Sequence, residues 1–220
     1  MDTHTSGLVD GWHDGLPVGK PGVMAGSMGL TLHSVQVGQA RAVRIQGRSI
    51  TTAFHKSTVA GPVAVATLGL QGDEQVDLSV HGGLGKAVYA YPLEHYPFWQ
   101  EARLRAGVIG GDAALEPGAM GENLTLTGLL ETGVWVGDVL RFAHCQLRVT
   151  QPREPCYKFN AAMGFATAAK AMAQSGHCGF YLAVDEPGTL QAGEPFELRP
   201  GPRQTSVAQM FQTKMFKHMR

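Results

Sequence analysis

The sequence has few cysteines, no excess of charge of either sign and no long apolar run. Its three cysteines, Cys145, Cys156 and Cys178, are odd in number and none belongs to a CxxC motif, which excludes a fully paired disulfide framework and the common zinc-binding patterns. The 18 basic residues balance the 18 acidic ones, so neither polymeric nucleic acid nor an anionic membrane is an expected partner. No apolar stretch reaches the roughly 18–20 residues that a transmembrane helix needs. A cytoplasmic protein with at least one reduced thiol is therefore expected.

The first 30 residues differ in composition from the rest of the chain. They contain seven glycines and no continuous apolar segment of the kind found in a secretory signal. Such a segment buries too little apolar surface to offset the entropy lost on ordering, so residues 1–30 are predicted to be a flexible lead-in. One domain is expected over residues 31–200. A short tail follows over residues 201–220, in which a helix can form from Ser206 to His218.

From Ser34 onward, short apolar runs alternate with glycine and proline, which is typical of strands joined by turns. Two helices are expected before the tail. One is Leu93–Arg105, where Pro97 bends or restarts the first turn, and the other is the alanine-rich Asn160–Gln174, which stops before Gly176. Many short strands and few helices predict a mainly β fold, built as a barrel or a strongly curved sheet with a few peripheral helices. Strands are expected at residues 35–37, 43–45, 50–54, 62–70, 86–91, 133–142, 145–149, 179–184 and 196–198.

A diglycine and a lysine stand at the start of the strand expected at residues 86–91. Gly82 and Gly83 let the backbone approach a ligand closely and present its N–H groups. Lys86 supplies a point charge that suits a phosphate. The spacing is neither that of a Walker loop nor GxGxxG, so no nucleotide motif is assigned. The alternative is a mobile surface turn with solvated charges.

Titratable residues precede this diglycine. His81 could serve as a base, a ligand or a proton donor, because the unperturbed pKa of histidine lies near neutrality. Asp73, Glu74 or Glu122 could orient the imidazole. An isolated histidine is more often a structural residue that meets its hydrogen bonds inside the fold, and this alternative stays open.

Cys156 lies in a stretch that cannot continue the strand before it. Pro152 and Pro155 have no backbone N–H to donate to a neighbouring strand, so the strand must stop here. Arg153 and Lys158 flank Cys156, and two nearby cations favour the thiolate, which is both a nucleophile and a ligand for soft metals. The alternative is a buried structural cysteine, which is the common role of a lone cysteine.

A third and weaker signal is the pair Glu122-Asn123, which enters a strand beginning near Leu124. By itself such a pair is typical of a cap or a turn. It gains meaning only together with the two preceding segments.

Taken in order, these segments resemble the MOSC domain, a family named for its occurrence at the C-terminus of molybdenum cofactor sulfurase. The likeness runs from about Ser34 to Pro200 and is greatest to the stand-alone bacterial branch linked to resistance against 6-N-hydroxylaminopurine. Relative to that branch the lead-in is extra, Pro97 interrupts a helix, and the tail is short. The residues that carry the resemblance are Gly72–Gln75, His81–Gly83, Lys86–Val88, Tyr91–Tyr96, Gly121–Asn123, Gly137-Asp138 and Gln151–Lys158.

The resemblance implies a MOSC-type β-barrel, similar to the barrel of pyruvate kinase. It also implies a molybdenum cofactor, a pterin-bound metal that can be lost from recombinant protein, with Cys156 as the protein ligand to the metal. The implied reaction is the reduction of N-hydroxylated purines and related small molecules, with electrons from a separate flavin-containing reductase. The implied site comprises the catalytic residues Cys156, His81 and Glu74 and the cofactor-binding residues Arg153, Lys158, Lys86, Gly82, Gly83, Asn123 and Glu122.

Two other functions fit the same residues. A carrier would hold the cofactor, or a persulfide sulfur on Cys156, and pass it to another protein without turnover of its own. A cysteine hydrolase would use Cys156 with His81, although the sequence has no nucleophile elbow and no known cysteine-protease signature. Metal analysis combined with a turnover assay separates the carrier from the reductase. An esterase activity that is sensitive to iodoacetamide and needs no metal would support the hydrolase.

Overall fold

The computed structural model describes residues 29–45, 47–76 and 82–218, so that His81 and all but the last two residues of the predicted lead-in lie outside it. The helices are η1 (Leu84–Lys86), η2 (Leu93–His95), α1 (Tyr96–Arg105), α2 (Tyr157–Met163), α3 (Ala168–Ser175) and α4 (Val207–His218). The strands are β1 (Thr31–Val37), β2 (Arg41–Ile45), β3 (Arg48–Thr52), β4 (Ser57–Thr58), β5 (Val63–Ala66), β6 (Gly69–Leu70), β7 (Val88–Pro92), β8 (Leu124–Thr127), β9 (Val139–Arg141), β10 (Gln146–Pro152), β11 (Phe180–Glu186), β12 (Gly188–Leu190) and β13 (Glu197–Arg199).

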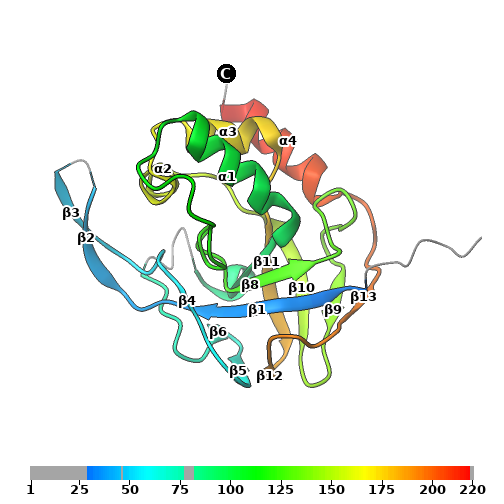
Figure 1. Ribbon diagram of the computed structural model, residues 1–220. Helices are drawn as coiled ribbons and strands as arrows, with labels where there is room; N and C mark the ends of the chain where they lie inside the picture. The colour runs from blue at the N-terminus through cyan, green and yellow to red at the C-terminus, as the bar shows by residue number, and fades with distance from the viewer. Residues whose placement is uncertain (1–28, 46, 77–81, 219–220) are drawn as a thin grey trace, which may run out of the picture.

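Eight strands form one large mixed sheet in the order β13-β9-β10-β11-β7-β8-β1-β4. The pair β7 and β8 is parallel, because the connection between them crosses over through η2 and α1, and the other neighbours are antiparallel. Two smaller sheets, β12-β5-β6 and β2-β3, complete the strands. Figure 1 shows the four α-helices gathered on one side of the large sheet, with β5 and β12 on the opposite side.

Backbone hydrogen bonds carry the large sheet round into a barrel. Leu32 donates its N–H to the carbonyl of Glu194 (3.0 Å) and accepts from the N–H of Gly193 (2.7 Å), while Phe196 donates to Leu30 (3.1 Å). The segment 193–196 leads directly into β13, which pairs with β9. The strands β9, β10, β11, β7, β8 and β1 are thus joined in sequence, and β1 is joined through segment 193–196 and β13 back to β9. The predicted mainly β fold with a few peripheral helices is confirmed.

The helices agree with the sequence in two cases and differ in one. Pro97 lies in the first turn of α1, where its missing N–H costs no helical hydrogen bond, and the tail contains α4 as expected. The prediction of one helix over Asn160–Gln174 was wrong, because the chain forms α2 and α3 instead. Gly164 ends α2 in the left-handed conformation (φ 81°), which breaks the run of helical residues.

The helical layer is tied to the barrel by buried aromatic side chains. Trp99 of α1 is fully buried and meets Phe159 of α2 edge to face, with ring centroids 5.0 Å apart. The indole N–H of Trp99 also donates to the hydroxyl of Tyr91, which belongs to β7. Phe159 in turn packs on Phe54, from the connection after β3. These contacts hold the start of α2 against the end of the barrel where the cavity described below opens. No helix in the described part of the chain is both long and apolar enough to cross a membrane.

Gly164 and Gly176 end the neighbouring helices α2 and α3, and their substitution measures how much stability depends on glycine at the break between α2 and α3. Gly176 ends α3 with φ 76°, and a Cβ there would meet nothing within 4 Å, so Gly176→Ala should lower the free energy of unfolding only by the left-handed strain, about 1 kcal/mol. At Gly164 a Cβ would also lie 2.9 Å from Cγ1 of Val108, so Gly164→Ala should cost more. Urea unfolding of both variants measures the difference. An equal or smaller loss for Gly164→Ala would contradict this account of the break.

Candidate functional site

A cavity opens where the end of β10 and the start of α2 face the connections after β3 and β6. Polar, charged and aromatic side chains line it together, which is typical of a site for a polar ligand. The lining residues are Thr52, Ala53, Phe54, Lys56, Asp73, Glu74, Gln75, Val76, Lys86, Tyr89, Gly121, Asn123, Arg153, Cys156, Lys158 and Tyr181.

The way β10 ends brings the residues after it to this cavity. The register of β10 against β11 shifts between Val149 and Gln151, so Thr150 forms a bulge. The Thr150 hydroxyl is within hydrogen-bonding distance of the carbonyl oxygens of Gly85 (2.6 Å) and Tyr181 (3.1 Å), which ties the bulge to η1 and to β11. The strand ends at Pro152, as the prolines predict, and Cys156 caps the start of α2 in an extended conformation. Cys156 is half-buried and its side chain is at the cavity.

Arg153 is the central charge of the site and is only 4% exposed. Its guanidinium carbon lies 5.1 Å from the ring centre of Tyr89, 5.2 Å from that of Phe159 and 5.4 Å from that of Phe54. Burial opposes the charge, but nearby Tyr89, Tyr181 and Cys156 outweigh it and raise the pKa of Arg153, so the side chain stays a cation.

One nitrogen of this guanidinium has no hydrogen-bond partner in the described part of the chain. Nη1 of Arg153 is buried and finds no acceptor among the described residues. Cation–π contacts contribute about 1–2 kcal/mol each where water is excluded. Burying an ion costs several kcal/mol, and an unmet buried donor costs about 1–3 kcal/mol more. The rings supply no acceptor for this nitrogen, and an anionic ligand in the cavity would complete the site.

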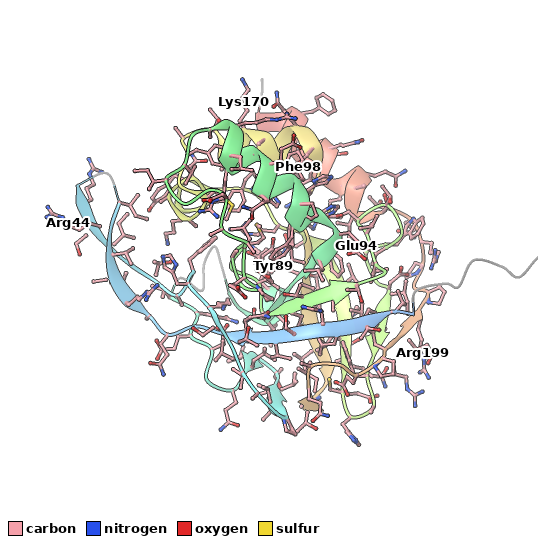
Figure 2. The ribbon with its side chains drawn as sticks, viewed as in Figure 1. Arg44, Tyr89, Glu94, Phe98, Lys170 and Arg199 are labelled. Atoms are coloured by element: carbon pink, nitrogen blue, oxygen red, sulfur yellow. The ribbon has the colours of Figure 1, made fainter. Side chains whose placement is uncertain are left out.

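Tyr89 supports Arg153 from the barrel. Burial, the largest effect, raises the pKa of Tyr89 well above its usual value, although the charge of Arg153 opposes the shift. The phenol therefore keeps its proton and donates it to the carbonyl of Cys178 at 2.8 Å. The backbone N–H of Arg153 donates to the carbonyl of Gly179, the residue after Cys178, at 3.4 Å. Figure 2 shows Tyr89 in the middle of the molecule, between the sheet and the helices.

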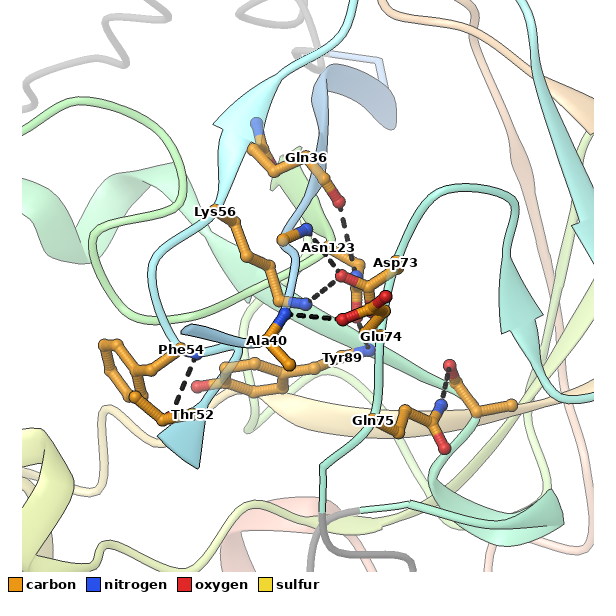
Figure 3. A network of polar contacts seen from close by, with 12 residues as sticks. Gln36, Ala40, Thr52, Phe54, Lys56, Asp73, Glu74, Gln75, Tyr89 and Asn123 are labelled. Carbon is orange, nitrogen blue, oxygen red and sulfur yellow. Dashed lines mark hydrogen bonds and ion pairs between the residues drawn. The ribbon is translucent and has the colours of Figure 1, made fainter. Parts of the chain in front are cut away.

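The opposite wall of the cavity carries an ion pair. Lys56 and Asp73 form a close, buried salt bridge, and Asp73 also accepts the N–H of Gly38 at 2.8 Å (Figure 3). Burial, the largest effect, lowers the pKa of Lys56, and the charge of Asp73 opposes the shift. Glu74 lies beside this pair, and its carboxylate accepts the N–H of Ala40 at 2.6 Å. This wall therefore offers both a cation and a carboxylate to a ligand.

Asn123 and Glu122 separate in space although they are neighbours in sequence. Asn123 lines the cavity, where its amide oxygen accepts the Tyr89 N–H (3.1 Å) and its amide nitrogen donates to the Gln36 carbonyl (3.3 Å). Glu122 is fully buried, and its carboxylate accepts from the N–H groups of Gly118 (2.7 Å) and Met120 (3.0 Å). The structure does not bring Glu122 to the cavity, and its contacts are those of a residue that fixes a turn.

Some of the other predicted site residues line the cavity and some do not. Among the described residues, the cavity brings together Cys156, Glu74, Arg153, Lys158, Lys86 and Asn123. Gly83 lies nearby in sequence, but its N–H donates to the side chain of Gln75 at 3.1 Å and neither it nor Gly82 is among the lining residues. Lys86 lies 5.7 Å from the ring centre of Tyr181. His81 is outside the described residues.

Sequence reasoning missed the aromatic residues of the cavity and one of its cations. Tyr89 alternates with apolar residues in its strand, so its pattern is that of any core tyrosine. Phe54 and Lys56 stand in an irregular connection with no recognisable spacing. Lys56 meets Asp73 from 17 positions away, and no sequence signal indicates this contact.

Comparison with known proteins gives a consistent result. Residues 77–197 match the model of the MOSC domain family. The uncharacterized protein YflK of Bacillus subtilis is 38% identical over 165 residues, which cover 75% of this chain and 71% of YflK. A protein named reductase from Gibberella moniliformis is 33% identical over 197 residues, which cover 86% of this chain but 32% of the reductase, so the chain spans about a third of that relative.

A solved structure shows the same fold. The crystal structure of YiiM from Geobacillus stearothermophilus superposes with a TM-score of 0.68 at 32% sequence identity. The superposition covers 87% of this chain and 86% of YiiM. The barrel and its helices are therefore shared over most of both chains.

The three cysteines should differ in reactivity. Burial raises the pKa of the Cys145 thiol to about 12, and burial also raises that of Cys178 well above its usual value, whereas Cys156 is half-buried at the cavity. Iodoacetamide at neutral pH should therefore modify Cys156 first in the native protein, as peptide mass spectrometry can show. The control Cys156→Ser should lose the fast modification. Equal labelling of Cys145 or Cys178 would place the reactive thiol elsewhere.

Proposed function

Because the chain belongs to the MOSC domain family, we propose that it binds a molybdenum cofactor beside Cys156 and reduces N-hydroxylated purines and related small molecules. The observation that carries the proposal is that the thiol of Cys156 shares one cavity with the buried guanidinium of Arg153, whose Nη1 has no partner among the described residues. A relative named reductase supports an oxidoreductase rather than a hydrolase. The proposed electron source is a separate flavin-containing reductase, and a cytoplasmic location would keep the thiol reduced.

The residues present fit a cofactor that combines a soft metal site with a phosphate. Cys156 offers a thiolate, the ligand type that soft metal centres prefer. Arg153 offers a buried donor with no acceptor among the described residues, and Lys158 and Lys86 add positive charge at the same cavity. Asn123, held by Tyr89 and Gln36, fixes the wall behind them. We assign the metal contact to Cys156 and the phosphate contacts to Arg153, Lys158 and Lys86.

The bound cofactor would supply the two-electron redox chemistry, while the protein supplies binding, orientation and protons. Loss of oxygen from an N–OH group as water consumes two protons. Glu74 has its carboxylate at the cavity, held by the Ala40 N–H, and can pass a proton toward a bound substrate. We assign a second proton to His81, from the near-neutral pKa of histidine alone, since His81 lies outside the described residues.

The decisive experiment uses protein produced in a molybdate-supplemented host. Wild-type protein should contain molybdenum and pterin and should reduce 6-N-hydroxylaminopurine when a competent electron donor is present. Cys156→Ala should lose bound molybdenum and reduce the substrate at less than about a hundredth of the wild-type rate, because the protein ligand to the metal is gone. Cys145→Ala, which alters a buried cysteine away from the cavity, is the control.

The possible results of that experiment separate the functions. Full activity in Cys156→Ala would falsify the ligand assignment. Stoichiometric molybdenum without turnover in the wild type would instead identify a carrier. Circular dichroism of both variants confirms that loss of metal does not reflect loss of fold.

His81 and Cys156 should fail in different ways. If His81 delivers a proton, His81→Ala should lower kcat by about 10²-fold or more while the molybdenum content stays near that of the wild type. The measurement is kcat per bound molybdenum, with Cys156→Ala as the contrasting variant. A defect in His81→Ala that is fully explained by lost cofactor would make His81 a binding residue.

A further inference from the structure

The hairpin formed by β2 and β3 stands apart from the large sheet and reaches the cavity at its base, at Thr52. Among the described residues its two strands pair with each other and form a separate two-stranded sheet. Figure 1 shows the hairpin projecting from the body of the molecule. A two-stranded hairpin on its own is only marginally stable in water, so a partner that packs on this hairpin would stabilise it.

The hairpin carries a local positive charge in a chain that is neutral as a whole. Residues 29–72 contain no aspartate or glutamate. Arg41, Arg44 and Arg48 are exposed on the hairpin, and none of them forms a salt bridge with a described residue. Figure 2 shows Arg44 at the outer part of the hairpin, far from the sheet. The charge is therefore available to an acidic partner.

One face of the hairpin is apolar between two arginines. Val43 pairs directly with Ile50. Side chains two residues apart lie on the same face, so the pairs Ile45 with Arg48 and Arg41 with Thr52 share this face with them. The face thus has the half-buried side chains of Val43, Ile45 and Ile50 at its centre and an arginine toward each end, whereas Arg44 is exposed on the opposite face. An apolar centre with arginine around it is typical of a protein–protein interface. Anionic lipid and nucleic acid would also attract the arginines, and binding assays with vesicles and a DNA oligonucleotide separate them from a protein partner.

The same face leads to the cavity. Thr52, at the base of β3 and opposite Arg41, is buried and lines the cavity, and the next residues, Ala53 and Phe54, line it too. A protein bound along the face of the hairpin would therefore sit beside the cavity that contains Cys156.

We propose that the hairpin Arg41–Thr52 is the docking surface for an acidic electron-donor protein, an inference that rests on the proposed redox function. Opposite charges on the two proteins would steer their encounter and speed association at low ionic strength. Packing against the apolar centre of the face would fix the orientation of the partner in the complex. The position of the hairpin beside the cavity accounts for why the partner docks there and not elsewhere.

The test compares a protein donor with a small-molecule donor. Methyl viologen reduced by dithionite needs no docking surface, whereas a reduced flavodoxin is an acidic protein that does. The charge reversal Arg41→Glu, Arg44→Glu and Arg48→Glu should leave the viologen-driven rate undiminished. It should raise the apparent KM for flavodoxin about tenfold or more at low ionic strength and remove the salt dependence of that rate. Replacement of the same three residues by glutamine should give a smaller change in the same direction.

A matched control changes the net charge equally on other parts of the surface. Arg105→Glu, Lys170→Glu and Arg199→Glu alter exposed residues outside the hairpin and should leave the flavodoxin kinetics near those of the wild type. If the wild type has no viologen-driven activity, the proposed function itself fails. If it has that activity but shows none with flavodoxin, or if the hairpin and control variants behave alike, the docking surface is refuted. Loss of binding to anionic vesicles or to a DNA oligonucleotide in the hairpin variant, with unchanged flavodoxin kinetics, would also refute it.

Discussion

The candidate site is organised around the buried guanidinium of Arg153. Three rings surround this cation, and each comes from a different part of the chain: Phe54 from the connection after β3, Tyr89 from β7 and Phe159 from α2. Rings from both the barrel and the helical layer therefore contribute to the free energy that offsets burial of this charge. A site that keeps a cation away from water, with one donor that meets no acceptor among the described residues, is arranged for an anion before any ligand arrives.

Local chemistry made part of this site predictable. Pro152 and Pro155 stop a strand for a reason that holds in any fold, and residues just beyond the end of a barrel strand often reach a cavity. Cys156, chosen for its flanking cations, does line the cavity, while its role as a metal ligand stays a prediction. The alternation of short strands and turns likewise indicated the mainly β fold, since the spacing of apolar residues within each short segment is enough to predict a strand.

Other features depend on contacts that no local pattern contains. Glu122 and Asn123 are adjacent in the irregular segment before β8, yet the Glu122 carboxylate accepts hydrogen bonds within a buried turn and the Asn123 side chain lines the cavity. The break between α2 and α3 depended on Gly164 taking a left-handed conformation within an alanine-rich run, where helix propensity alone favours continuation. Lys56 joined the site only through its partner Asp73.

The hydrogen bonds that close the barrel have a consequence for the order in which it assembles. They join Leu30 and Leu32 to residues 193–196, which are separated by most of the length of the chain. Neighbouring strands such as β10 and β11 are separated only by two short helices. Because closing the longest loop costs the most chain entropy, we expect this seam to close late in folding, after the contacts between nearer strands have formed. The pocket around Arg153, built mainly from the middle of the polypeptide, can thus take shape on a barrel that is still open along one side.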